Sequence, residues 1–166
     1  MKLKAFNTAK PEERIRLLLN CCQSRNWAGL LSGAAPFDSS GSLLIAAADI
    51  WNSMGEEDFL EASRGHPRIG DLGALQKKYG ASPAEEQSGV RGADVRVLDL
   101  LKVQNERYLE KFGFIFIVYA PGKSAEDMLD LLEERLKNSR EAELANGAGQ
   151  QLLIMEARLR KLLESS

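Results

Sequence analysis

The only histidine of the chain, His66, lies in the segment GHPRIGD (residues 65–71), between two glycines and directly before Pro67. An imidazole whose unperturbed pKa is about 6.5 can accept or donate a proton at neutral pH, which makes His66 a candidate catalytic residue. Pro67 stiffens the chain after it, and the glycines allow a ligand to approach the backbone. Two interpretations are open from the residues alone: a structural loop histidine, or a titratable group that does chemistry.

A candidate carboxylate, Glu86, lies in the segment SPAEEQSG, which predicts the start of a helix. Ser82 is the expected N-cap, and Glu85 completes a capping box three residues later. Glu86 projects about 100° away from Glu85 and therefore faces something else. It is either a solvated carboxylate near a helix N-terminus or a catalytic group, and Gln87 beside it could hydrogen-bond a planar amide or urea.

The last predicted helix contains two arginines in different settings. Arg160 has a glutamate four residues away on either side, whereas Arg158 has Ile154 and Leu162 at those positions. Intrahelical ion pairs are therefore expected at Arg160. A guanidinium on an apolar stripe needs an anionic partner, so Arg158 either pairs with a carboxylate of the protein or binds an anionic ligand.

Composition excludes several functions. The 166 residues have a formal net charge of -2 and a pI near 5.6, which gives no electrostatic footprint for nucleic acid or an anionic membrane. Cys21 and Cys22 are adjacent, which favours two packed thiols on or near a helix over a disulfide or a zinc motif. With one histidine and no glycine-rich nucleotide motif, we predict neither a metal nor a cofactor.

Apolar residues recur at helical spacing along almost the whole chain, so helices are expected to position these groups. We predict an all-α, single-domain helical bundle of seven or eight helices over residues 1–166. The predicted helices include one from Pro11, a central, buried one within 42–55, a long one that ends at Gly113, one capped by Ser124 and a last one over 141–163. The apolar run FIFIVY (114–119) has no strand partner, so an extended or irregular core segment is expected there.

Targeting and membrane signals are not evident in the sequence. The first residues lack an apolar signal-peptide region, and no segment reaches 18 consecutive apolar residues. We therefore expect a soluble, cytoplasmic protein without a membrane partner.

Five ordered segments together carry a family resemblance: GHPRIGD, EEQSGV, NERYLEKFGFIFIV, ERLKNSREAEL and LLIMEARLRKL. They span nearly the whole chain and resemble the 2-oxo-4-hydroxy-4-carboxy-5-ureidoimidazoline (OHCU) decarboxylase family. The resemblance implies an all-helical protein, usually a homodimer, that works between uric acid and (S)-allantoin. Its implied partner is a small-molecule ureidoimidazoline, not a nucleic acid or a membrane.

The resemblance also implies roles for individual residues. His66 and Glu86 fall on the catalytic positions, and the positions that contact substrate are Pro67, Gln87, Arg158 and the main chain of Ile117. Family members commonly have a serine three residues before the glutamate, where this chain has Pro83. Ser82, one residue earlier, either only caps the helix or also reaches the ligand.

The implied reaction needs no cofactor, because the substrate carries its own electron sink, a ring C=N bond beside the carboxylated carbon. Two alternatives stay open: a non-catalytic helical binding module, and another ureide or purine-ring enzyme on the same scaffold. The sequence does not decide whether His66 or Glu86 delivers the proton to carbon.

Overall fold

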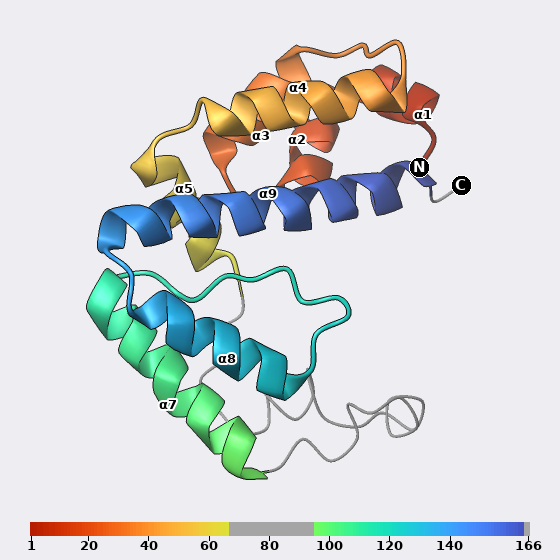
Figure 1. Ribbon diagram of the computed structural model, residues 1–166. Helices are drawn as coiled ribbons and strands as arrows, with labels where there is room; N and C mark the ends of the chain where they lie inside the picture. The colour runs from red at the N-terminus through yellow and green to blue at the C-terminus, as the bar shows by residue number, and fades with distance from the viewer. Residues whose placement is uncertain (67–94, 165–166) are drawn as a thin grey trace. The chain divides into compact units, whose positions relative to one another are not determined.

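The computed structural model describes residues 1–66 and 95–164, which form eight helices and no strand (Figure 1). For these residues the prediction of an all-α fold with seven or eight helices is confirmed. The chain divides into two compact units, one made of Met1–His66 with Asn146–Ser166 and the other of Pro67–Ala145. That residues 1–166 form a single domain stays a prediction.

The first unit is built from short helices and the longest helix of the described chain. It contains α1 (Leu3–Thr8), α2 (Pro11–Leu19), α3 (Arg25–Gly33), α4 (Ser40–Asn52), α5 (Glu56–Arg64) and the part of α9 (Arg140–Glu164) from Asn146 onward. Pro11 is at the first position of α2, as its fixed φ angle and missing N–H favour. The Ser24 hydroxyl caps α3 by accepting a hydrogen bond from the Trp27 N–H at 3.2 Å.

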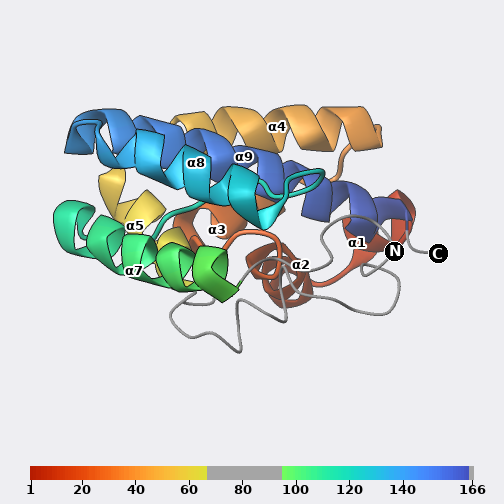
Figure 2. The same cartoon turned by 60° about the horizontal axis from the view of Figure 1, so that its bottom comes forward.

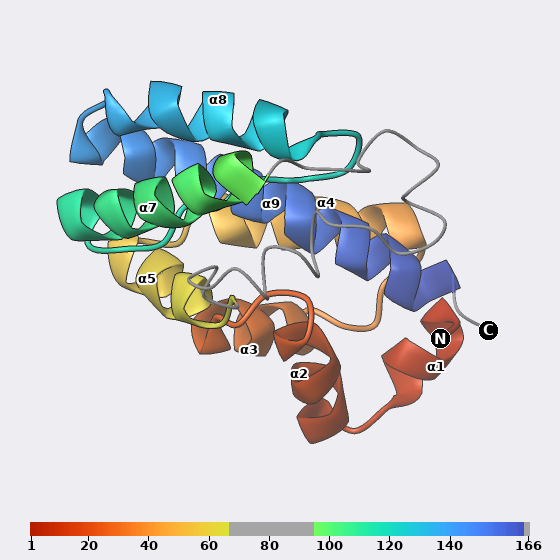
Figure 3. The same ribbon diagram turned by 90° about the horizontal axis from the view of Figure 1, so that it is seen from below.

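The core of this unit lies around α3, which packs against α2, α4 and α5, while α4 runs alongside α9 (Figures 1 and 3). Its fully buried large side chains include Phe6, Leu18, Trp27, Leu31 and Leu43. The prediction of a central, buried helix within 42–55 is wrong. Only one face of α4 is buried, and Ile45 on another face is 65% exposed, because α4 lies at the surface of this unit.

The second unit holds α7 (Val95–Phe112), α8 (Ala125–Leu136) and the first residues of α9. Gly113 ends α7 with a φ of 81°, a left-handed conformation that glycine adopts without strain. Residues 115–120 are extended without strand pairing, as expected, and return the chain so that α7 and α8 run side by side in the same direction (Figures 1 and 2). A capping box between Ser124 and Asp127 begins α8.

Aromatic side chains form much of the core of the second unit. Tyr108, Phe112, Phe114 and Phe116 are all buried, with ring centroids 4.5–6.0 Å apart in their contacting pairs. None of the helices in the described parts of the chain is both long and apolar enough to span a membrane.

Candidate active site

His66 lies just beyond the C-terminus of α5 and is partly buried. Its backbone N–H donates to the Ser63 carbonyl at 3.2 Å, which continues the helical turn by one residue. Gly65 before it packs tightly, because a Cβ there would lie 2.5 Å from Oε1 of Gln23. Glycine at position 65 therefore lets the backbone pass the Gln23 side chain, which a larger residue would displace.

The imidazole of His66 contacts α9 through Gln151. Nε2 of His66 and Oε1 of Gln151 are 2.5 Å apart, and the Gln151 side chain is only 1% exposed. The amide nitrogen of Gln151 is buried and has no well-aligned hydrogen-bond partner among the described residues, although the Gln151 side chain lies close enough to the Cys22 thiol to lower its pKa. A buried polar group left in this way is uncommon in native proteins and calls for an explanation.

A close approach of α9 to α5 brings Gln151 to His66. Gly147, one turn before Gln151, packs against the Phe59 ring of α5 so tightly that a Cβ would lie 2.7 Å from the ring. Gln151 then falls on the same face of α9, four residues further on. The glycine in the segment ANGAG thus sets the separation between the two helices that carry the pair.

Arg158 lies two turns beyond Gln151, close to the same face of α9 and about 10 Å along its axis. Its side chain is exposed, and Nη1 donates to the Cys21 carbonyl at 3.4 Å. Among the described residues no carboxylate lies within 4.0 Å of the guanidinium, so the protein partner considered from the sequence is not found there. Arg160 is also exposed, and within the described ranges it forms no ion pair with Glu156 or Glu164.

Cys21 and Cys22 are both buried and unbridged, in the turn after α2, as the sequence predicted. Burial raises the pKa of the Cys22 thiol to about 12 and that of Cys21 to about 11. A hydrogen bond from the Ser24 backbone, another from the Gln151 side chain and the nearby Arg158 guanidinium offset the rise in the pKa of Cys22 only in part. These thiols therefore belong to the packing behind the site and are poor nucleophiles.

A surface cavity of about 440 Å³ lies next to the His66 segment. Leu19, Gln23, Arg25, Glu61, Arg64 and Gly65 line it. Arg25 and Glu61 pair across it at 2.7 Å, and hydrogen bonds from the backbone and side chain of Arg25 lower the pKa of Glu61. The cavity reaches Gly65 but is not lined by the imidazole itself.

Ile117, whose main chain is predicted to contact substrate, belongs to the second unit and is buried. Its carbonyl accepts a hydrogen bond of 2.6 Å from Nη1 of Arg135. Nε of Arg135 lies 2.6 Å from the fully buried carboxylate of Glu143, which also accepts from the Tyr108 hydroxyl at 2.7 Å and from Asn138 at 2.9 Å. This network fixes the extended segment. It was not expected from the sequence.

The Tyr108 hydroxyl is part of this network and is strongly affected by it. Burial and its hydrogen bond to Glu143 raise the pKa of Tyr108, and the positive charge of Arg135 offsets only part of the rise. The guanidinium of Arg135 also lies over the Phe116 ring, 4.6 Å from its centroid. The tyrosine therefore acts as a neutral hydrogen-bond donor.

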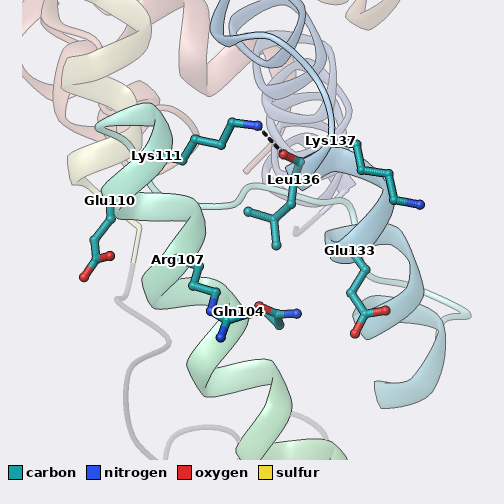
Figure 4. A pocket seen from close by; sticks show the side chains of 7 residues that line it. All are labelled: Gln104, Arg107, Glu110, Lys111, Glu133, Leu136 and Lys137. Atoms are coloured by element: carbon teal, nitrogen blue, oxygen red, sulfur yellow. Dashed lines mark hydrogen bonds between the residues drawn. The ribbon is translucent and has the colours of Figure 1, made fainter.

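A larger hollow of about 730 Å³ lies between α7 and α8 and is less suited to a ligand (Figure 4). Its charged side chains do not converge: Glu110, Glu133 and Lys137 point away from one another, while Lys111 bonds the Leu136 carbonyl. We assign no binding role to it.

Four residues predicted for the site lie outside the described residues: Pro67, Ser82, Glu86 and Gln87. Of the others, His66 and Arg158 belong to the first unit. His66 contacts α9 through Gln151, and Arg158, on α9 itself, donates to the Cys21 carbonyl. Sequence reasoning missed Gln151. A signal was present, because Gln151 falls in register with the buried Met155 and Leu159 of the apolar stripe.

Residues 7–160 match the OHCU decarboxylase family, and the chain belongs to this family. The resemblance drawn from the sequence is thereby confirmed.

Among its relatives is the uric acid degradation bifunctional protein TTL of Arabidopsis thaliana, 35% identical over 146 residues, or 86% of this chain and 45% of that protein. The 2-oxo-4-hydroxy-4-carboxy-5-ureidoimidazoline decarboxylase of Halalkalicoccus jeotgali is 28% identical over 76% of this chain and 71% of its own length. The chain thus spans less than half of the bifunctional plant relative.

Solved structures agree with the fold. A crystal structure of OHCU decarboxylase in the presence of (S)-allantoin is 32% identical, with a TM-score of 0.76, and the match covers 95% of this chain and 100% of that one. A structure of (S)-allantoin synthase is similar in fold, with a TM-score of 0.74 at 20% identity, over 100% of this chain and 55% of that one.

Proposed function

We propose that this chain decarboxylates 2-oxo-4-hydroxy-4-carboxy-5-ureidoimidazoline to (S)-allantoin without a cofactor, in the degradation of uric acid. The observation that carries the proposal is the family match over residues 7–160, which includes the His66 segment. In support, the one imidazole of the chain is held between α5 and α9, with Arg158 on the same face of α9.

The chemistry of the substrate fits a protein that supplies only acid–base and charged groups. The carboxylate leaves as CO₂, and the electron pair of the broken C–C bond moves into the neighbouring ring C=N bond. A proton must then reach carbon from one face to set the stereocentre. The protein has to orient the substrate, handle the hydroxyl proton and deliver this last proton.

In this proposal His66 polarises or deprotonates the substrate hydroxyl, and Glu86 shares its hydrogen-bond network. Arg158 binds the anionic side of the substrate, which suits a guanidinium with no carboxylate partner among the described residues. Gln87 and the main chain of Ile117 hold the heterocycle and the ureido group. The contacts of Pro67 and Ser82 are proposed from the family resemblance alone.

The test forms the unstable substrate in situ and follows the circular dichroism of the allantoin produced. We expect rapid formation of the (S)-enantiomer by the unaltered chain and a loss of at least about 100-fold in His66→Ala with an unchanged far-UV spectrum. Racemic product at the uncatalysed rate from a folded, unaltered chain would refute the proposal and favour a binding module. Turnover of a related heterocycle without CO₂ would favour another ureide enzyme.

Two arginines of α9 give a matched pair for the binding role. Arg158→Ala is expected to raise the KM or lower kcat/KM by at least about tenfold, whereas Arg160→Ala leaves both within twofold. Both side chains are exposed, so neither change should lower stability appreciably. Equal losses in the two variants would argue against substrate binding by Arg158.

We also propose that the chain works as a cytoplasmic homodimer, as the family resemblance implies. Exposed apolar side chains on α3, α4 and α9 offer contact area, namely Leu30, Ile45 and Leu153. Light scattering coupled to size exclusion measures the mass directly, and cell fractionation tests the compartment.

A further inference from the structure

We propose that Gln151 is a positioning residue that holds His66 in the tautomer protonated on Nε2, so that Nδ1 is the ring nitrogen that accepts a proton. The catalytic meaning of this role rests on the proposed function, but the tautomer itself does not. The geometry gives the reason, because Oε1 of Gln151 accepts a hydrogen bond and faces Nε2 at 2.5 Å.

The position of Gln151 is costly for a side chain that only fills space. Gln151 is 1% exposed, in register with the fully buried Met155, and its amide nitrogen has no well-aligned hydrogen-bond partner among the described residues. An apolar side chain of the same length would fill the space without leaving this group unsatisfied. The amide oxygen is explained by its contact with His66, while the same side chain also lies against the Cys22 thiol.

A neutral amide also suits a histidine that cycles between two protonation states. Nε2–H donates to the amide oxygen both in the neutral ring and in the imidazolium, so the contact persists when Nδ1 gains or loses its proton. The amide itself neither gains nor loses a proton near neutral pH. Gln151 can thus keep the ring oriented through the whole cycle, while the Gly147 contact with Phe59 fixes the distance of α9.

The single histidine makes the test unambiguous. Protein labelled with ¹⁵N in the histidine ring gives signals from the two ring nitrogens of His66 alone, and their chemical shifts and one-bond N–H couplings report which one carries the proton. We expect a neutral ring protonated on Nε2 in the unaltered chain. A ring protonated on Nδ1 would mean that the Gln151 amide donates instead, and it would overturn the proposal.

Two substitutions separate the hydrogen bond from packing. Gln151→Met keeps the length but removes the acceptor, and we expect a mixture of both tautomers. Gln151→Glu keeps an acceptor and should retain the proton on Nε2. Gln104→Met, the same exchange on α7, should leave the spectrum unchanged. A single Nε2–H tautomer in Gln151→Met would refute the proposal. If that variant does not fold, the Gln151→Glu variant decides, and a ring protonated on Nδ1 there would refute the proposal.

Activity then separates this proposal from the function proposed above. We expect Gln151→Met to lower kcat for (S)-allantoin formation by at least about tenfold with KM within twofold, since the ring is misoriented but substrate contacts remain. A changed tautomer with no activity in the unaltered chain would refute the function and leave the positioning role intact. A changed tautomer with unchanged kcat would refute the catalytic meaning of that role.

Discussion

The buried ion pair of the second unit should show strong energetic coupling. Arg135 and Glu143 are 11% and 0% exposed at their side chains, with 2.6 Å between Nε and Oε1. Arg135→Met removes the cation and leaves a carboxylate that water does not reach. Glu143→Gln keeps the shape and leaves the guanidinium without its counter-charge. Each variant therefore leaves one buried charge without its partner, which lowers the unfolding free energy.

The magnitude follows from the distance and the burial. Two unit charges 2.6 Å apart attract by about 6 kcal/mol at an effective dielectric constant of about 20, and desolvation of both groups cancels much of this. Removal of one partner of such a pair costs about 3–5 kcal/mol of unfolding free energy. The double variant contains no uncompensated charge, so we expect a coupling energy of about 2–3 kcal/mol in the double-mutant cycle.

Equilibrium urea unfolding followed by far-UV circular dichroism measures the four free energies, provided that the m-values agree. The exposed pair of Lys137 and Glu134, 3.1 Å apart with side chains more than 70% exposed, is a matched control with an expected coupling below about 0.5 kcal/mol. If the effects of the Arg135 and Glu143 changes add to within about 0.5 kcal/mol, the pair is not coupled and the reasoning fails.

Burial of single groups leads to three further expectations. The pKa of the Cys22 thiol is raised to about 12, so a thiol reagent at pH 8 should label the native chain at least about tenfold more slowly than the urea-unfolded chain, and equal rates would contradict this. Gly147→Ala would place a Cβ 2.7 Å from Phe59 and should lower the unfolding free energy by about 1–3 kcal/mol. Gly149 has open space around it, so Gly149→Ala should raise the unfolding free energy by up to about 1 kcal/mol. Denaturant midpoints of the two variants measure the difference. Because the pKa of Tyr108 is raised, the folded chain keeps this proton above pH 10 where the unfolded chain loses it, so the tyrosine makes stability fall by about 1.4 kcal/mol per pH unit there. Tyr108→Phe should remove that part of the slope, and an unchanged slope would refute the assignment.

Local features of the fold were predictable from the sequence because each depends on neighbouring residues. Pro11 at the start of a helix, Ser124 as an N-cap and Gly113 as a helix end all act within one turn, and all three are found. The extended segment after Gly113 was also expected, since no other apolar run could pair with it as a strand. Periodicity placed α9 correctly as well.

The contacts that give the site its geometry were not predictable in the same way. Gln151 was recognisable as a polar residue on an apolar stripe, but its partner His66 is 85 residues away, and no local rule pairs them. The same holds for Tyr108 and Glu143, which are 35 residues apart. The burial of α4 was overestimated because apolar residues around a whole helix do not tell which face meets a neighbour.

The tryptophans and the described tyrosines lie in different units, so their optical signals report on the two units separately. Both tryptophans belong to the first unit, and their indole N–H groups bond backbone carbonyls at 3.0 Å: Trp27 to Ala47 and Trp51 to Ala148. Among the described residues, the tyrosines Tyr108 and Tyr119 belong to the second unit. Tryptophan emission therefore reports the first unit and the absorbance of Tyr108 and Tyr119 the second. Coincident transitions would mean that both unfold as one cooperative system.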